Sequence, residues 1–187
     1  MEAKIVYFPE PGPQNTEEVL RIANNRAKEL GIKTIVVAST RGQTGARATE
    51  VFSGIKLVVV SQITGFEGPN TQQMTPENRK KIESKGETIL ITAHIFGGLA
   101  ASMRIKFGMY LFEEVVSNTL RLFGQGTKVA CEVAIMAADA GLARTDEDII
   151  AIAGTNQGAD TALLLRPVTS REFFDLKIKE ILCKPHF

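Results

Sequence analysis

The strongest constraint on the fold of this chain is the alternation of short apolar runs with segments of helical periodicity. The run at 32–38 (IKTIVVA) is rich in β-branched residues and lacks a regular apolar and polar alternation, which is typical of a strand covered on both faces. Similar apolar runs lie at 5–8, 56–60, 87–93, 149–153 and 161–167. Because helical patterns separate most of them, the sequence predicts a layered α/β fold with a mainly parallel sheet.

Local signals place helices between these strands. Asn15 and Glu18 have the spacing of a capping box, and Gly31 ends the helical pattern that follows them. Thr75-Pro76 has the residue types that open a helix, and Gly86 ends that polar segment. Helices are also predicted at 46–52, 109–123 and 127–140, whereas 94–108 is expected to be a loop with a short helix. The 127–140 segment is apolar almost all round, so we expect it to be buried.

The C-terminal part returns to strand patterns. The runs 149–153 and 161–167 are joined by the turn-forming segment GTNQGAD, which predicts an antiparallel hairpin. The alternation of Phe174, Leu176 and Ile178 predicts a third, half-exposed strand, with a helical turn as the alternative for 180–184. No repeat or linker divides the chain, so a single domain is expected over residues 1–187.

Composition excludes several classes of protein. The 187 residues are 44% hydrophobic and 23% charged, with a formal net charge of +1, which argues against disorder and against a nucleic-acid partner. No leader pattern or apolar stretch of spanning length is present, so a cytoplasmic protein without a membrane partner is expected. Whether the chain forms a homo-oligomer stays open at this point.

The two cysteines, Cys131 and Cys183, form no CxxC pair and no cluster with His94 or His186. The sequence therefore predicts no metal site. Cys131 lies in an apolar helical run, where a buried, reduced thiol is the common state of a cytosolic cysteine.

The most informative polar segment is STRGQTG at 39–45, between a predicted buried strand and a helix. Ligands of open α/β sheets gather at the carboxyl ends of strands, and a helix N-terminus offers free N–H groups to an anion. The hydroxyls of Ser39, Thr40 and Thr44 add donors, and Arg41 adds charge. The segment predicts a phosphate site, although it matches neither a Walker A motif nor GxGxxG. The alternative is a capped helix entry with turn glycines.

A second segment of this kind is 154–160, which has adequate turn chemistry for a plain hairpin. Two hydroxyl- and glycine-rich loops at strand ends in one small domain favour a shared anion site. The segment 63–70 follows a strand on the same expected edge, and its Phe66 is a candidate cover for a flat ring. His94 ends the run 87–93 and should reach that edge, as a ligand donor or as a structural group.

Further charged residues give weaker signals. Arg104 and Lys106 follow a glycine turn and either reach a phosphate or form a solvated face. Glu132 and Asp139 are seven positions apart on one side of a helix, where capping or salt bridging competes with acid–base work. No Ser/His/Asp order or nucleophile elbow names a reaction, so no catalytic residue is assigned.

Several of these segments resemble a known family. TIVVASTRGQTGARATEVF resembles the strand, loop and helix of the carboxy-terminal α/β domain of pyruvate kinase, and IIAIAGTNQGADTALLLRPV resembles its closing hairpin. Through NTLRLFGQGTKVACEVAIMAADAGL and ITGFEGPN, the chain is similar to stand-alone archaeal proteins built like that domain. In pyruvate kinase the two matching loops belong to an allosteric sugar-phosphate site.

The resemblance implies a three-layer α/β sandwich with a C-terminal antiparallel hairpin and, for the stand-alone relatives, a bound flavin mononucleotide (FMN). It places the FMN phosphate on the loops at 39–46 and 154–160, and the ring near Phe66, His94 and Phe96. The pyruvate kinase reaction itself is not implied, because the chain has no room for the catalytic barrel. The full set of implied cofactor-binding residues is Ser39, Thr40, Arg41, Gly42, Thr44, Gly45, Ala46, Thr64, Gly65, Phe66, His94, Phe96, Gly154, Thr155, Asn156, Gly158, Ala159 and Asp160.

Three functions remain in competition. The first is an FMN-binding protein, as an oxidoreductase of unassigned substrate. The second is a regulatory sensor that binds a sugar phosphate or a nucleotide. The third is a phosphotransfer or hydrolytic enzyme that uses Asp160 or Glu132.

Overall fold

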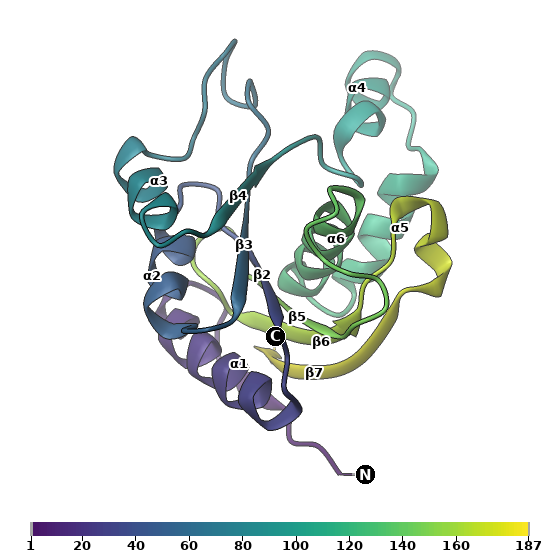
Figure 1. Ribbon diagram of the computed structural model, residues 1–187. Coiled ribbons are helices and arrows are strands. Elements are labelled where there is room, and N and C mark those ends of the chain that lie inside the picture. Colours follow the sequence, from purple (N-terminus) through teal and green to yellow (C-terminus); the bar gives the residue numbers. More distant parts are fainter. Residues whose placement is uncertain (1, 187) are drawn as a thin grey trace.

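The computed structural model describes residues 2–186, and the strands of this part of the chain form one seven-stranded sheet (Figure 1). The order is β1-β7-β6-β5-β2-β3-β4. Every neighbouring pair is parallel except β5–β6 and β6–β7, so β6 alone runs against the others. The predicted mainly parallel sheet with an antiparallel C-terminal hairpin is confirmed. The strands are β1 (Val6–Phe8), β2 (Thr34–Ala38), β3 (Lys56–Ser61), β4 (Thr88–Ile91), β5 (Ile149–Ala153), β6 (Thr161–Arg166) and β7 (Lys177–Pro185).

Helices cover both faces of the sheet, as Figure 1 shows. One face carries α1 (Thr16–Leu30), α2 (Gln43–Val51) and α3 (Pro76–Glu83). The other face carries α6 (Gln125–Asp139), with α5 (Phe112–Arg121) packed on α6 and α4 (Gly98–Phe107) packed on α5. Two short 3-10 helices, η1 (Pro13–Asn15) and η2 (Ser170–Asp175), complete the elements.

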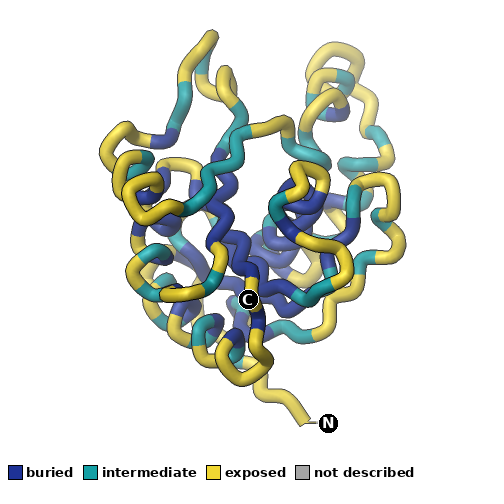
Figure 2. Tube along the Cα trace, viewed as in Figure 1, coloured by how far each residue is buried: buried dark blue, intermediate teal, exposed yellow. Residues whose placement is uncertain are grey.

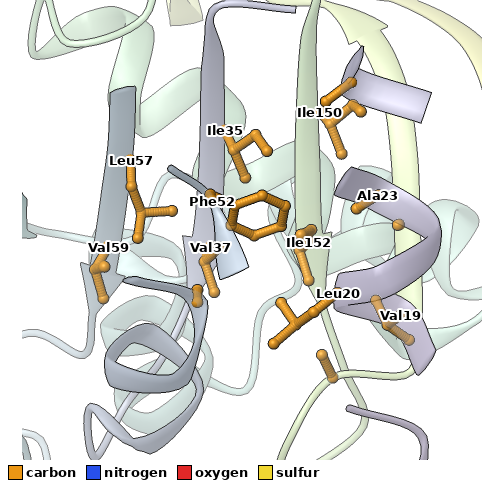
Figure 3. Close-up of a cluster of buried hydrophobic side chains, with 14 of the residues drawn as sticks. Val19, Leu20, Ala23, Ile35, Val37, Phe52, Leu57, Val59, Ile150 and Ile152 are labelled. Carbon is orange, nitrogen blue, oxygen red and sulfur yellow. The ribbon is translucent and has the colours of Figure 1, made fainter. Parts of the chain in front are cut away.

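The core consists of two apolar layers, because successive residues of a strand point to opposite faces. Ile35 and Val37 face α1 and α2, where the Phe52 ring lies among them (Figure 3). Val36 and Val58 face α6, whose Thr127–Ala138 stretch is buried almost throughout, as predicted. Figure 2 shows this burial concentrated in the strands and in α6.

The start of α1 differs from the sequence prediction. Asn15 is the last residue of η1 and makes no capping bond, because its side-chain amide donates to the carbonyl of Glu10 at 2.8 Å. The helix begins at Thr16, whose hydroxyl accepts from the backbone N–H of Ala159 at 3.0 Å. The predicted capping box is therefore wrong, because a contact between distant segments replaces it.

Several other boundaries shift. The edge strand β4 has one neighbour and is only half-buried, so the prediction of a fully covered strand at 87–93 is wrong. α2 begins at Gln43, earlier than predicted, and α5 begins at Phe112. Residues 180–184 belong to β7, so the helical-turn alternative is excluded. At Thr75 the predicted cap is confirmed, since its side chain accepts from the N–H of Asn78.

Both cysteines are free and buried, and the environment of each explains why it should be unreactive. Burial raises the pKa of both the Cys131 and the Cys183 thiol to about 12. Because the thiolate is the reactive form, we expect neither thiol of the native protein to react with an aromatic disulfide reagent at pH 8. Both should react once the chain is unfolded in denaturant. Rapid labelling of the native protein would contradict this prediction.

Candidate anion site at the carboxyl edge of the sheet

The two polar loops singled out in the sequence lie at the same edge of the sheet. β2 and β5 are adjacent and parallel, with Val37 opposite Ile152, so the residues that follow both strands emerge side by side. β3 lies on the other side of β2 in parallel register, with Ala38 opposite Val60. The loops at 39–42, 62–75 and 154–160 therefore leave the sheet at its carboxyl edge, where open α/β sheets bind ligands.

The turn between β2 and α2 is held by hydrogen bonds within the protein. The Ser39 hydroxyl is buried and accepts from the N–H of Gly45 at 3.0 Å, so it caps the helix from inside. Gly42 has φ +87°, a left-handed conformation that favours glycine and lets the chain turn sharply into α2. Ser39, Gly45 and Ala46 are buried and thus shape the turn without facing solvent.

The same turn holds backbone donors without a partner in the described part of the chain, on the exposed Gln43 and the buried Thr44. Among residues 2–186, no group accepts a hydrogen bond from the backbone N–H of Gln43 or Thr44, which open α2. These N–H groups carry the positive end of the helix dipole. Arg41 is exposed, and its guanidinium makes no ion pair within the described part of the chain. The exposed Thr40 lies beside it. The combination is suited to an anion.

Side chains from the end of β3 and from α3 brace this turn. The Ser61 hydroxyl donates to the carbonyl of Thr40 at 2.8 Å, and the Asn78 amide donates to the carbonyl of Arg41 at 2.9 Å. Both bonds hold the backbone on each side of the Arg41 side chain. The free donors are therefore presented by a supported turn.

The 154–160 loop is organised around one buried carboxylate. Asp160 is fully buried and accepts from the N–H of Gly12 at 3.2 Å, from the N–H of Thr155 at 2.9 Å and from the Thr161 hydroxyl at 2.8 Å. Its oxygens are therefore occupied within the protein. Asp160 holds the loop in shape and has no access to a ligand or to a reacting group.

Other predicted residues of this loop have different exposures. Ala159 is buried, and its N–H is used by Thr16. Asn156 is exposed, with a left-handed φ of +67°, whereas Gly154, Thr155 and Gly158 are half-buried. The loop thus presents Asn156 and the neighbouring backbone to solvent.

The aromatic residue of the β3 loop, Phe66, is exposed to solvent. The Phe66 side chain is 65% exposed, so it is free to cover a ligand. Thr64 and Gly65 are also exposed, but both are engaged within the loop: the Thr64 hydroxyl accepts from Gln72, and the N–H of Gly65 bonds the carbonyl of Thr71.

The segment after β4 contacts the first turns of α6. His94 is half-buried, with Nδ1 3.7 Å from Glu132 Oε2. Burial lowers the pKa of His94, an effect that the charge of Glu132 opposes. The N–H of Phe96 donates to Glu132 Oε1 at 3.1 Å, and the Phe96 ring is buried edge-on against Phe173. Phe96 is therefore a core residue and cannot flank an exposed ring.

Sequence reasoning missed the contribution of α6 to this edge. No role was assigned to residues 124–126 from the sequence, yet the start of α6 packs against Asp160 and Thr161 behind the 154–160 loop. A Gly-x-Gly pair before a buried apolar helix was the available signal, because it permits such close packing.

The weaker sequence candidates have structural roles. Arg104 donates to Glu114, and Glu132 pairs with Lys128. Asp139 accepts from the N–H of Ser170 at 2.8 Å. Glu132 and Asp139 therefore do not act as a carboxylate pair.

Two pockets stand out, and neither is lined by residues 39–46 or 154–160. One, of about 630 Å³, lies at the amino edge of the sheet beside Lys33 and Asp148. The other, of about 320 Å³, lies between α4, α5 and α6. Over residues 2–186, no helix is long and apolar enough to cross a membrane, and no His, Cys, Asp and Glu side chains gather as a metal site would require.

The family is established by sequence. The profile of the pyruvate kinase alpha/beta domain matches residues 17–165, which include β2 to β5 and both polar loops. The chain therefore belongs to the pyruvate kinase alpha/beta domain family, and the resemblance of its sequence to that domain is confirmed.

Solved structures that resemble the chain include a pyruvate kinase from Cryptosporidium parvum, at 17% identity and a TM-score of 0.44 over 86% of this chain and 24% of that one. A Cryptosporidium parvum pyruvate kinase in complex with ADP also matches, at 17% identity and a TM-score of 0.44 over 86% and 25% of the two chains. This chain thus spans about a quarter of the length of those enzymes.

Proposed function

We propose that the chain binds the phosphate group of a small phosphorylated molecule at the carboxyl edge of its sheet, and that FMN is the specific candidate. The observation that carries the proposal is the set of unpartnered donors at this edge. The N–H groups of Gln43 and Thr44 and the Arg41 guanidinium lie in a braced turn, and the 154–160 loop leaves the adjacent parallel strand. Such donors bind oxyanions without further rearrangement.

The residues fit the two parts of FMN unequally. The phosphate matches the free N–H groups and Arg41. For the ring, the exposed Phe66 and the half-buried His94 are available, whereas Phe96 is enclosed in the core. When bound, FMN would supply hydride and electron transfer, and the protein's part is to hold its phosphate and cover its ring. Such binding would make the chain a flavoprotein.

A comparison of FMN with riboflavin tests the proposal, because the two share the ring and differ in the phosphate. Titration followed by flavin fluorescence should show FMN binding at least about tenfold tighter than riboflavin, a difference of about 1.4 kcal/mol. In Arg41→Gln we expect FMN affinity to fall by roughly tenfold, as for the loss of one charge-assisted hydrogen bond, while riboflavin affinity stays the same.

Arg144→Gln is the matched control, because Arg144 is an exposed arginine on the loop before β5, paired with Asp146. It should bind FMN as the wild type does. A hexose bisphosphate tested by thermal shift separates the regulatory-sensor alternative from the flavin. If it raises the melting temperature and FMN does not, a sugar phosphate replaces FMN as the ligand of this edge. If neither binds, or Arg41→Gln changes nothing, the proposal fails.

A further inference from the structure

A second site is indicated by the pocket between α4, α5 and α6. Its volume of about 320 Å³ lies at the lower end of the range of small-molecule sites, roughly 300–1,000 Å³. Its lining includes Arg104, Arg121 and Lys128 beside a single carboxylate, that of Glu114. Neither polar loop of the carboxyl edge contributes to it. The pocket is therefore a different candidate from the proposed phosphate site.

The most informative residue of this pocket is Lys128. Its side chain is only 9% exposed, and its Nζ makes one hydrogen bond within the described chain, to Glu132 Oε2 at 2.5 Å. The Phe96 ring, with its centroid 5.5 Å from Nζ, provides the other favourable contact. An ammonium has three donors, and leaving donors unpaired in a buried place is costly. An oxygen of a bound molecule would satisfy them.

The guanidinium of Arg121 also lines the pocket, and two of its three nitrogens already donate hydrogen bonds within the protein. Its Nε donates to Gln125, and its Nη1 donates to Ser117 at 2.7 Å and to Asn118 at 2.8 Å. These three bonds fix the plane of the guanidinium. Over residues 2–186 its Nη2 has no acceptor, so a fixed charged donor remains for a ligand.

Glu114, in contrast to these two cations, has an acceptor without a donor. Its Oε1 accepts from Arg104 Nε at 2.7 Å, whereas its buried Oε2 has no hydrogen-bond partner in the described chain. Buried carboxylate oxygens are normally hydrogen-bonded. A ligand hydroxyl in the pocket would donate to Oε2 after a small rotation of the Glu114 side chain. A ligand of this pocket therefore needs acceptors on the side of Lys128 and Arg121 and a donor on the side of Glu114.

Charge selects among the molecules that meet both needs. The cations Arg104, Arg121 and Lys128 against the anions Glu114 and Glu132 leave one net positive charge. A singly charged carboxylate balances it, while a phosphate monoester, which carries nearly two charges, would meet repulsion from Glu114. We infer that this pocket binds a small hydroxycarboxylate, with its carboxylate on Lys128 and Arg121 and its hydroxyl on Glu114.

Four small molecules test the inference on the full chain by isothermal titration. D-glycerate and L-lactate carry both groups, propionate lacks the hydroxyl, and glycerol lacks the carboxylate. We expect glycerate or lactate to bind with a Kd of about 1 mM or tighter, and propionate and glycerol at least about tenfold more weakly.

Two variants separate the two contacts. Arg121→Gln should weaken lactate and propionate alike, by about tenfold. Glu114→Gln removes the charge of the carboxylate and its unpartnered oxygen while keeping the shape of the side chain, so the preference for lactate over propionate should fall toward one. Arg144→Gln should bind as the wild type does, and circular dichroism checks that each variant is folded. Absence of hydroxycarboxylate binding at about 10 mM, or affinities that neither variant changes, would overturn the inference.

Discussion

Replacing Asp160 by alanine is expected to lower the free energy of unfolding by about 3–5 kcal/mol, because it leaves two buried donors and one half-buried donor without an acceptor. These donors are the N–H groups of Gly12 and Thr155 and the Thr161 hydroxyl. They belong to three separate stretches of the fold: the loop before η1, the 154–160 loop and β6. The same change should loosen the 154–160 loop and so weaken ligand binding at the carboxyl edge.

Denaturant unfolding followed by circular dichroism measures this effect. Asp146→Ala is the matched control, because the Asp146 side chain is 64% exposed and pairs with the exposed Arg144. Its removal should change the unfolding free energy by no more than about 0.5 kcal/mol. An Asp160→Ala protein as stable as the wild type would show that the buried carboxylate does not organise the loop.

The second large effect is expected for Gly126→Ala. Alanine normally stabilises a helix relative to glycine, by about 1 kcal/mol. At this position the added Cβ would lie 2.1 Å from Thr161 Oγ1, 2.5 Å from Thr161 Cβ and 2.8 Å from Asp160 Oδ1. Because such overlaps force α6 away from β6, we expect a net loss of about 3 kcal/mol.

Gly98→Ala provides the control with the opposite sign. Gly98 opens α4, and a Cβ added there meets no atom within 4 Å. This variant should be as stable as the wild type or up to about 1 kcal/mol more stable. The two melting temperatures should therefore move apart by several degrees. Equal shifts for the two variants would mean that α6 does not pack against β6 as closely as the structure shows.

The sequence was sufficient to predict which edge of the sheet carries the proposed ligand site, because that edge is marked by the loops that directly follow the strands. The run 32–38 and the loop 39–45 reveal a strand followed by a helix, and 149–153 followed by 154–160 reveals another strand end. Once both strands are parallel neighbours, their loops must meet. That they are neighbours is a property of the sheet order, which the structure supplies.

Local signals failed where a distant segment competes for the same group. Asn15 and Glu18 have capping-box spacing, but the Asn15 amide turns to Glu10, and Thr16 takes the N–H of Ala159. The family resemblance placed Phe96 near a ligand ring, yet packing on Phe173 encloses its side chain. In each case tertiary packing outweighs the local preference.

Periodicity and composition were sufficient for the layers, the mainly parallel sheet, the C-terminal hairpin and the buried helix α6, because each depends on which residues avoid water. Only the tertiary structure showed which polar groups already have hydrogen-bond partners within the protein and which do not. Asp160 and Arg41 both lie in glycine-rich loops at strand ends. Within residues 2–186 the Asp160 carboxylate is engaged, by Gly12 148 positions away among others, whereas the Arg41 guanidinium has no acceptor. Burial and hydrogen-bond partners of this kind arise from contacts that no local pattern records.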